Sequence, residues 1–555
     1  MSRRTVSRNG LVNRREFLAL SGAAALAACA PTTGGGPSAT AVSATATPKR
    51  GGTLIWAQIL DNSVIDPHVA TEASAQEIDG ELFDFLVAAD SDLNIQPWLA
   101  TKWTIENNAT KYTFTLRDDV TFHDGTPFDS TSVKKTIERI VDPATKAGRA
   151  LALLGPLDHA EAPDPRTAIL FFKEPNPLLL VSLWRPWFGM LSPKQLATLK
   201  PGEPLTTPIG TGPYRFAGRT ADGQTTLERN PDYKWAPAFA ANHGSTYFDA
   251  IKLRRIAEPG TRVATLESGE SLLVDDLPEA DYVRLKNDKR FTFLQAGKKG
   301  PGYGFFFNVK KFPVSELAVR QAMNWAVDRQ SIVDRVLFGV HHPLVGPLTE
   351  GVWGRLDDIE KTIPYSGDKK KAADILEAAG WKVGAGGIRE KNGQRLSLVL
   401  AANAGAYPQN DLADALQLQV KEIGIDLQVQ KMPSAAFFDF TRGSYKHDLC
   451  DSMGANIDPD ELRGRYHSKF IGSTNFANTS DPQLDDLLVK GQNTPVGTDA
   501  RKQVYADVQR RLMDTMPMLS MISVIRTYGM TNRLHGLKVN PTGINTYALT
   551  DTWLE

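Results

Sequence analysis

The chain has 555 residues, with 63 basic and 63 acidic side chains and a formal net charge of zero. This length exceeds what a single hydrophobic core usually sustains, so we expect two packed domains. The balanced charge argues against nucleic acid or an anionic membrane surface as the main partner. Apolar residues make up 41% of the chain, which is typical of a soluble globular protein.

The first thirty residues have the pattern of an export signal, with a basic start, a short apolar run and small residues at its end. Arg14 and Arg15 match the twin-arginine export signal, and the apolar run that follows is too short to span a bilayer. The run ends in Leu-Ala-Ala-Cys at Cys29, which resembles the lipobox of bacterial lipoproteins, where the cysteine is acylated and becomes the new N-terminus. We predict a twin-arginine lipoprotein signal peptide at 1–28; the alternative is an ordinary signal peptide with a chance cysteine.

The stretch 29–49 is rich in Gly, Ser, Thr, Ala and Pro, and it cannot bury enough apolar surface to offset its ordering entropy. We interpret it as a flexible tether between the lipid and the folded body. Cys450 is the only other cysteine, so we expect no disulfide despite an exported location facing the periplasm or the cell exterior.

The first block of the body mixes a strand and a helix. Alternating apolar residues predict a half-buried strand over 112–117, and Asp124-Gly125 marks a turn. A polar capping residue at 129–131 then begins a helix whose apolar residues recur on one face over 133–140.

A second block predicts a helix over 372–379 that ends at Gly380, and then a strand at 396–400. Another helix over 412–423 ends at Gly424, and a strand with alternating apolar residues follows directly. This strand–helix–strand order favours an α/β sheet with crossover connections.

Several segments together resemble the peptide, dipeptide and nickel class of periplasmic binding proteins, known as solute-binding protein family 5. Each segment alone is weak, but their order and spacing over several hundred residues make the match specific. The segments are 51–54, 66–68, 97–100, 112–117, 122–128, 208–214, 229–233 and 319–329.

The resemblance implies an α/β, two-lobed periplasmic-binding-protein fold of type II, of the large peptide-binder type with an extra subdomain in lobe I. It places lobe I at 50–300 with an inserted subdomain at about 81–203, lobe II at 301–519, and a return to lobe I at 520–555. The implied role is that of a monomeric substrate-binding component of an ABC importer, which closes on a small solute such as a peptide and delivers it to a membrane permease. We expect no cofactor, no metal site and no nucleic-acid partner.

Peptide-binding members hold the ligand's ammonium group on an aspartate three residues before an Asp-Pro-Asp segment. Here the register puts Ala455 at that position, and alanine accepts no hydrogen bond. Asp458 or Asn456 would replace the anchor if the loop shifts. Peptide and non-peptide ligands, such as an oligosaccharide, an opine or a nickel chelate, therefore stay open as alternatives.

Sugar-like or heterocyclic ligands favour aromatic platforms, for which Trp184, Trp187 and Trp353 are candidates, although large aromatic residues more often pack in a core. The full set of expected ligand-binding residues is Asp61, Trp184, Trp187, Tyr303, Trp353, Met453, Ala455, Asn456 and Asp458. The adjacent His341 and His342 should point to different faces, which argues against a shared metal site.

Four further features of the sequence have a structural interpretation. The glycines of the 208–214 turn are expected to supply special backbone angles near the hinge, and Arg320 is expected to form an ion pair. His123 is interpreted as a turn histidine rather than a metal ligand, and the pair Asp275-Asp276 as a solvated turn.

Two other functions remain as rivals. A secreted hydrolase would need a nucleophile with a base or a metal site, and the sequence has no G-x-S-x-G, H-E-x-x-H or C-x-x-C motif. A surface receptor or chaperone would use the same closing lobes without import.

Overall fold

The computed structural model describes residues 47–59, 64–70, 73–90, 93–200, 202–364, 366–404, 407–452, 457–540, 543–544 and 548–555. Several predicted residues lie outside this described part of the chain: Arg14, Arg15, Cys29, Asp61, Met453, Ala455 and Asn456. None of the helices among the described residues has the length and apolar character needed to cross a membrane.

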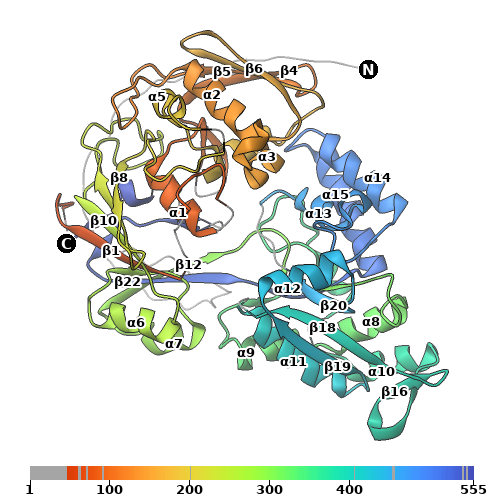
Figure 1. Cartoon of the computed structure of the whole chain (residues 1–555). Helices are drawn as coiled ribbons and strands as arrows, with labels where there is room; N and C mark the ends of the chain where they lie inside the picture. Colours follow the sequence, from red (N-terminus) through yellow and green to blue (C-terminus); the bar gives the residue numbers. More distant parts are fainter. Residues whose placement is uncertain are drawn as a thin grey trace, which may run out of the picture. The chain divides into compact units, whose positions relative to one another are not determined.

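Two mixed sheets organise the described residues, and we call the parts of the chain around them lobe I and lobe II (Figure 1). The seven-stranded sheet of lobe I has the order β12 (Phe291–Gly297), β22 (Ile525–Thr531), β11 (Leu273–Val274), β1 (Thr53–Gln58), β10 (Ala250–Arg255), β9 (Thr225–Arg229) and β8 (Tyr214–Arg219). Strand β1 runs parallel to both β10 and β11, and the other pairs are antiparallel. Helices α6 (Pro259–Glu267) and α7 (Glu279–Leu285) contact this sheet, and α1 (Ala73–Leu82) contacts β8.

A second part of lobe I is built on a four-stranded antiparallel sheet with its own hydrophobic core. Its order is β4 (Ala100–Glu106), β5 (Lys111–Leu116), β7 (Thr167–Phe172) and β6 (Leu157–Asp164). The alternating burial of β5 confirms the predicted strand, and α2 (Ser130–Val141) begins after Asp129, whose carboxylate caps it. Helices α3 (Gly148–Leu154) and α4 (Leu179–Leu183) pack into the same core.

The six-stranded sheet of lobe II has the order β14 (His342–Pro343), β21 (Met518–Ser523), β13 (Tyr303–Phe307), β20 (Leu449–Ser452), β18 (Ser397–Asn403) and β19 (Asp426–Met432). Strands β18 and β19 are parallel and are joined by α11 (Gln409–Lys421), which confirms the predicted crossover unit. The helix α10 (Lys369–Ala378) is also as predicted, and Gly380 and Gly424 follow their helices with φ of 89° and 85°.

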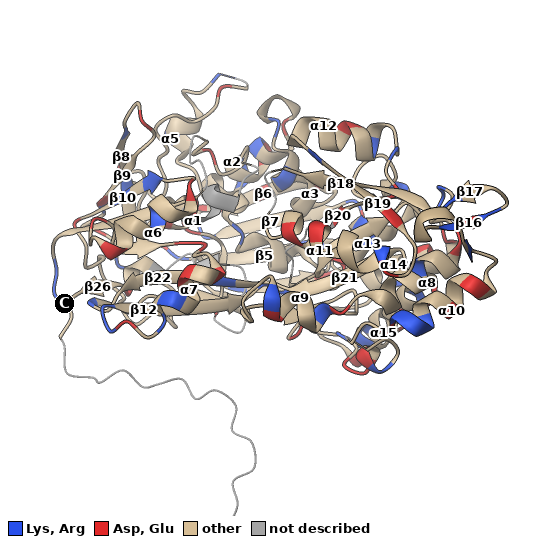
Figure 2. Ribbon diagram, turned by 90° about the horizontal axis from the view of Figure 1, so that it is seen from below, with Lys and Arg blue, Asp and Glu red and all other residues tan. Residues whose placement is uncertain are grey.

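The chain passes twice between the two lobes (Figure 1). The first passage leads from β12 to β13 through residues 298–302, and the second leads from β21 to β22 at Val524. Because β21 pairs with β13 as far as Ile522, the second crossing falls after the predicted return at residue 520. Basic and acidic residues are interspersed along the ribbon, in keeping with the net charge of zero (Figure 2).

Two local interpretations need correction. The turn at 208–214 leads into β8, the edge strand opposite β12, so it does not lie at the crossings. Its glycines do not have positive φ; a Cβ on Gly212 would instead lie 2.5 Å from the carbonyl carbon of Leu82. Arg320, on α8 (Leu317–Ala326), forms no ion pair among the described residues, because its guanidinium donates to the carbonyl oxygens of residues 314, 315 and 515.

Candidate functional site

A cavity of about 210 Å³ lies between the two lobes. On the lobe I side it is lined by α3, α4, the residues that follow each helix, and residues 174–178 before α4. On the lobe II side it is lined by the turn at 458–460 and by α13 (Glu461–Tyr466). A ligand here would touch both lobes, as closure of a two-lobed binding protein requires.

Two arginines of lobe I, Arg149 and Arg185, line this cavity. Arg185 is 5% exposed and Arg149 lies close enough to repel it. Burial, together with Arg149 and against the attraction of Glu461, lowers the pKa of Arg185 to about 10. Neither guanidinium has an ion-pair partner among the described residues. A buried guanidinium without an anion is unfavourable, so the pair is suited to a negatively charged ligand group.

The two predicted tryptophans lie behind these arginines. Arg185 stacks 4.9 Å from the ring centroid of Trp184, and Arg149 lies 5.3 Å from that of Trp187. Both rings are almost fully buried in the core of the subdomain, and Nε1 of Trp187 donates to the carbonyl of Ala70 at 2.7 Å. The tryptophans therefore support the arginines instead of offering open aromatic platforms.

The acidic residues on the lobe II side are paired within their own lobe. Arg501 donates to both carboxylate oxygens of Asp458, at 2.9 and 2.7 Å. Asp460 accepts from Arg463, and Glu461 lies 2.9 Å from Arg465. Among the described residues, the charges at the cavity that have no ion-pair partner therefore belong to lobe I: Arg149, Arg185 and the exposed Glu174.

Trp353 is 36% exposed, and its ring centroid lies 5.6 Å from the guanidinium carbon of Arg501. It therefore belongs to the support of Asp458 and does not line the cavity between Arg185 and α13.

Tyr303 lines a different cavity, of about 390 Å³, beside the two crossings. Nζ of Lys298 donates to the Tyr303 hydroxyl at 2.8 Å. His341 and His342 diverge as predicted: His341 is buried and lies 2.7 Å from Glu279 of lobe I, whereas His342 is exposed.

Asp275 and Asp276 also lie beside the crossings. The expectation of a solvated turn is wrong for Asp275, whereas Asp276 stands in a bend and its side chain is 35% exposed. Asp275 is 1% exposed, and Arg526 donates to both carboxylate oxygens of Asp276, at 2.7 and 2.9 Å. The pair belongs to the packed junction between β11 and β22 because Arg526 stands on β22.

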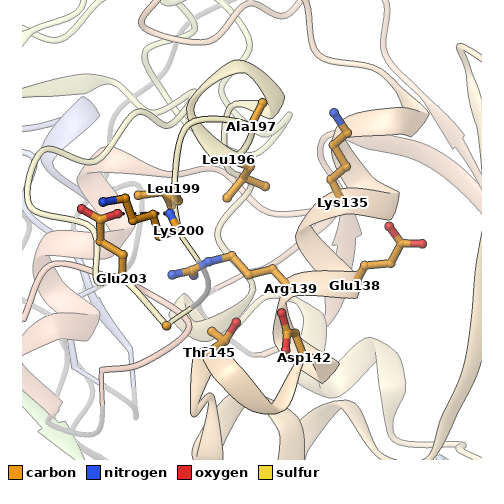
Figure 3. Close-up of a pocket in the computed structure, with 11 residues that line it drawn as sticks. Lys135, Glu138, Arg139, Asp142, Thr145, Leu196, Ala197, Leu199, Lys200 and Glu203 are labelled. Atoms are coloured by element: carbon orange, nitrogen blue, oxygen red, sulfur yellow. Dashed lines mark hydrogen bonds between the residues drawn. The ribbon is translucent and has the colours of Figure 1, made fainter.

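A third cavity, of about 320 Å³, lies within lobe I between α2 and residues 196–203. Figure 3 shows charges of both signs around it, with Lys135, Arg139 and Lys200 beside Glu138, Asp142 and Glu203. It touches no residue of lobe II, so closure of the lobes would not seal it.

His123 has the contacts expected of a turn histidine. Its Nε2 lies 3.0 Å from the carbonyl oxygen of Gly212, and its Nδ1 accepts from the Gly210 amide at 3.3 Å. No group of three or more potential metal ligands occurs among the described residues.

Of the predicted ligand-binding residues that the structure describes, only Asp458 lines the 210 Å³ cavity at Arg185. Tyr303 lines the 390 Å³ cavity, which also touches both lobes. The sequence interpretation missed Arg149 and Arg185. The available signal was the order Trp184-Arg185-Pro186-Trp187, in which a cation stands between two aromatic residues.

The chain has relatives of known structure. It matches the family model described as bacterial extracellular solute-binding proteins, family 5 Middle, over residues 94–473. A nickel-binding periplasmic protein of Escherichia coli strain K12 is 27% identical over 474 residues, which are 81% of this chain and 85% of that protein. The binding protein AgaA of A. tumefaciens R10, in complex with agropinic acid, is 25% identical, with a TM-score of 0.74 over 91% of this chain and 99% of that one. The oligopeptide-binding protein AppA of Bacillus subtilis, in complex with a nonapeptide, shares the fold at 23% identity, with a TM-score of 0.76 over 92% of this chain and 100% of that one.

Proposed function

The chain belongs to the bacterial extracellular solute-binding proteins of family 5, and from this premise we propose that it captures a small acidic solute between its lobes and delivers it to an ABC permease. The ligand contributes binding free energy that favours the closed form, and the permease recognises that form. The chain itself performs no chemistry on the solute.

The proposal of an acidic ligand rests on two arginines that have no ion-pair partner among the described residues. Arg185 and Arg149 face a cavity shared by both lobes, while the carboxylates on the other side have partners of their own. A carboxylate bound between the lobes would accept charge-assisted hydrogen bonds from a guanidinium.

The ion pair of Asp458 with Arg501 supports a solute that is not held through an ammonium group. Its two oxygens already accept from Arg501, which argues against Asp458 as a substitute for the anchor expected at Ala455. Agropinic acid, the compound bound in the AgaA structure, carries an acid group and fits this description.

A thermal-shift series tests the proposal. The compounds are agropinic acid, the nickel–L-histidine complex, glutathione, a neutral oligosaccharide and a tripeptide methyl ester. At a hundred times its dissociation constant, a bound ligand adds about 2.7 kcal/mol to the free energy of unfolding. Stabilisation by an acid, lost on esterification of its carboxylates, supports the proposal. Equal stabilisation by the neutral compounds would contradict it.

We also propose that the chain is exported by the twin-arginine pathway and anchored through a lipid on Cys29. Replacing Arg14 and Arg15 by lysine should retain the chain in the cytoplasm. Replacing Cys29 by serine should leave the chain exported but should abolish incorporation of labelled palmitate, and continued labelling would refute the anchor.

A further inference from the structure

Arg501 connects the body of lobe II to the wall of the cleft. It stands in the first turn of α15 (Asp499–Thr515), and its side chain is fully buried. Its two terminal nitrogens donate to Asp458, and its Nε donates to the carbonyl of Gly491 at 3.0 Å on α14 (Pro482–Asn493). The guanidinium also lies 4.9 Å from the Tyr505 ring centroid. All three guanidinium nitrogens of Arg501 therefore donate a hydrogen bond, and the group also contacts an aromatic ring.

The turn that contains Asp458 is also stabilised by hydrogen bonds of Asp460. Asp458 Oδ1 accepts from the backbone amide of Asp460 at 2.8 Å, which closes the turn before α13. The Asp460 carboxylate in turn accepts from the Tyr505 hydroxyl at 2.8 Å and from Arg463. Two residues of α15, one turn apart, therefore hold both aspartates of the Asp-Pro-Asp segment.

Ile457, the residue before Asp458, contacts lobe I from lobe II. Ile457 packs against the hydrophobic core of the lobe I subdomain, whose other members lie between residues 85 and 240. The next residue, Asp458, carries the ion pair with Arg501. The same turn lines the cavity opposite Arg185.

We propose that Arg501 is a positioning residue for ligand capture: through Asp458 it sets the turn at 457–460, which forms the lobe II wall of the cleft and the Ile457 contact with lobe I. We call the ion pair of Arg501 and Asp458 the clamp; Asp458 then holds the turn and does not contact the solute. The inference rests on the proposed function for its meaning, but its test needs no ligand.

Hydrogen exchange of the full chain, measured without ligand, tests the local effect. Arg501→Gln and Asp458→Asn should each accelerate exchange in segment 457–466 by about tenfold, because each leaves one buried charge without its partner. Arg501→Lys keeps the charge and should restore part of the protection. Arg329→Gln is the matched control, since Arg329 is also a fully buried arginine of lobe II and its Nε donates to the Ser520 carbonyl at 2.7 Å.

The clamp is contradicted if Arg329→Gln accelerates this segment as much as Arg501→Gln, or if neither Arg501→Gln nor Asp458→Asn accelerates it. Asp458→Asn preserves shape, so it carries the test if Arg501→Gln does not fold.

A double-mutant cycle with Ile457→Ala measures the coupling between the two substitutions, which general destabilisation does not change. If Arg501 acts through Ile457, the two changes should be non-additive by at least about threefold in the unfolding equilibrium constant. The cycle of Arg329→Gln with Ile457→Ala should be additive. Additivity in both cycles would overturn the positioning role, whereas a failed ligand screen would overturn only the acidic solute.

Discussion

Glu279 of lobe I lies with its Oε1 2.7 Å from Nε2 of His341 in lobe II. The Tyr407 hydroxyl, also of lobe II, donates to the other carboxylate oxygen, and Nδ1 of His341 accepts from the backbone amide of Ile525 at 3.0 Å. Burial raises the pKa of Glu279, but the contacts of its carboxylate with His341 and Tyr407 hold that pKa below its usual value. The cluster therefore joins the lobes beside the crossings, at a place separate from the arginine pair.

We predict that Glu279→Ala lowers the free energy of unfolding by about 1–3 kcal/mol, because it leaves the buried imidazole without its acceptor. Urea denaturation measures this change. His342→Ala is the control, since the neighbouring imidazole is exposed and should change stability by less than about 0.5 kcal/mol. Equal effects of the two substitutions would show that the contact between the lobes contributes nothing.

Replacing Arg185 should separate binding from stability. Arg185→Gln removes a buried charge that burial and Arg149 both disfavour, so the unliganded chain should be as stable as before or more so. Stabilisation by an acidic ligand should be lost. Arg320→Gln is the matched control, because its guanidinium satisfies three backbone carbonyls and its removal should destabilise the chain. Loss of stability in Arg185→Gln would mean that this arginine has a structural role instead.

Much of the secondary structure follows from local patterns. Strand β5 and helices α2, α10 and α11 lie where apolar spacing and capping residues place them, because their buried faces have the period of the element itself. The glycines after α10 and α11 stop their helices for the expected backbone reason.

The site was harder to predict because its properties depend on contacts between distant segments. Asp458 looks available in the sequence, yet its partner Arg501 is 43 residues away. Arg320 and Arg185 are both buried arginines, but only the structure shows that one has carbonyl partners and the other has none among the described residues. Residues 453–456, which hold three of the predicted ligand contacts, lie outside the described residues.

Asp84 should make stability depend on pH. Burial raises its pKa from 3.8 to about 7, although Trp235 Nε1 at 2.7 Å and the Tyr233 hydroxyl at 3.1 Å both donate to it. Between these two pKa values the folded chain holds a proton that the unfolded chain has lost. The free energy of unfolding therefore falls as pH rises from about 4 to about 7, by as much as about 4 kcal/mol from this group.

Urea denaturation of the wild type and Asp84→Asn across pH 4–8 measures this contribution, and the variant should show a flatter fall. Asp451, whose pKa burial also raises to about 7, remains in both proteins and provides the residual slope. Parallel curves for the two proteins would show that Asp84 titrates alike in the folded and unfolded chains.

The glycine turn before β8 should be sensitive to a single methyl group. A Cβ on Gly212 would lie 2.6 Å from the carbonyl oxygen of Glu81 and 2.5 Å from the carbonyl carbon of Leu82, at the end of α1. Backbone atoms cannot move aside as a flexible side chain can, so Gly212→Ala should destabilise the chain by about 1–3 kcal/mol or more. Gly148→Ala, the first residue of α3, meets open space and should stabilise by about 0.4–1 kcal/mol. If Gly212→Ala were as stable as the wild type, α1 would have to shift away from the turn, and hydrogen exchange over 78–84 would reveal that shift.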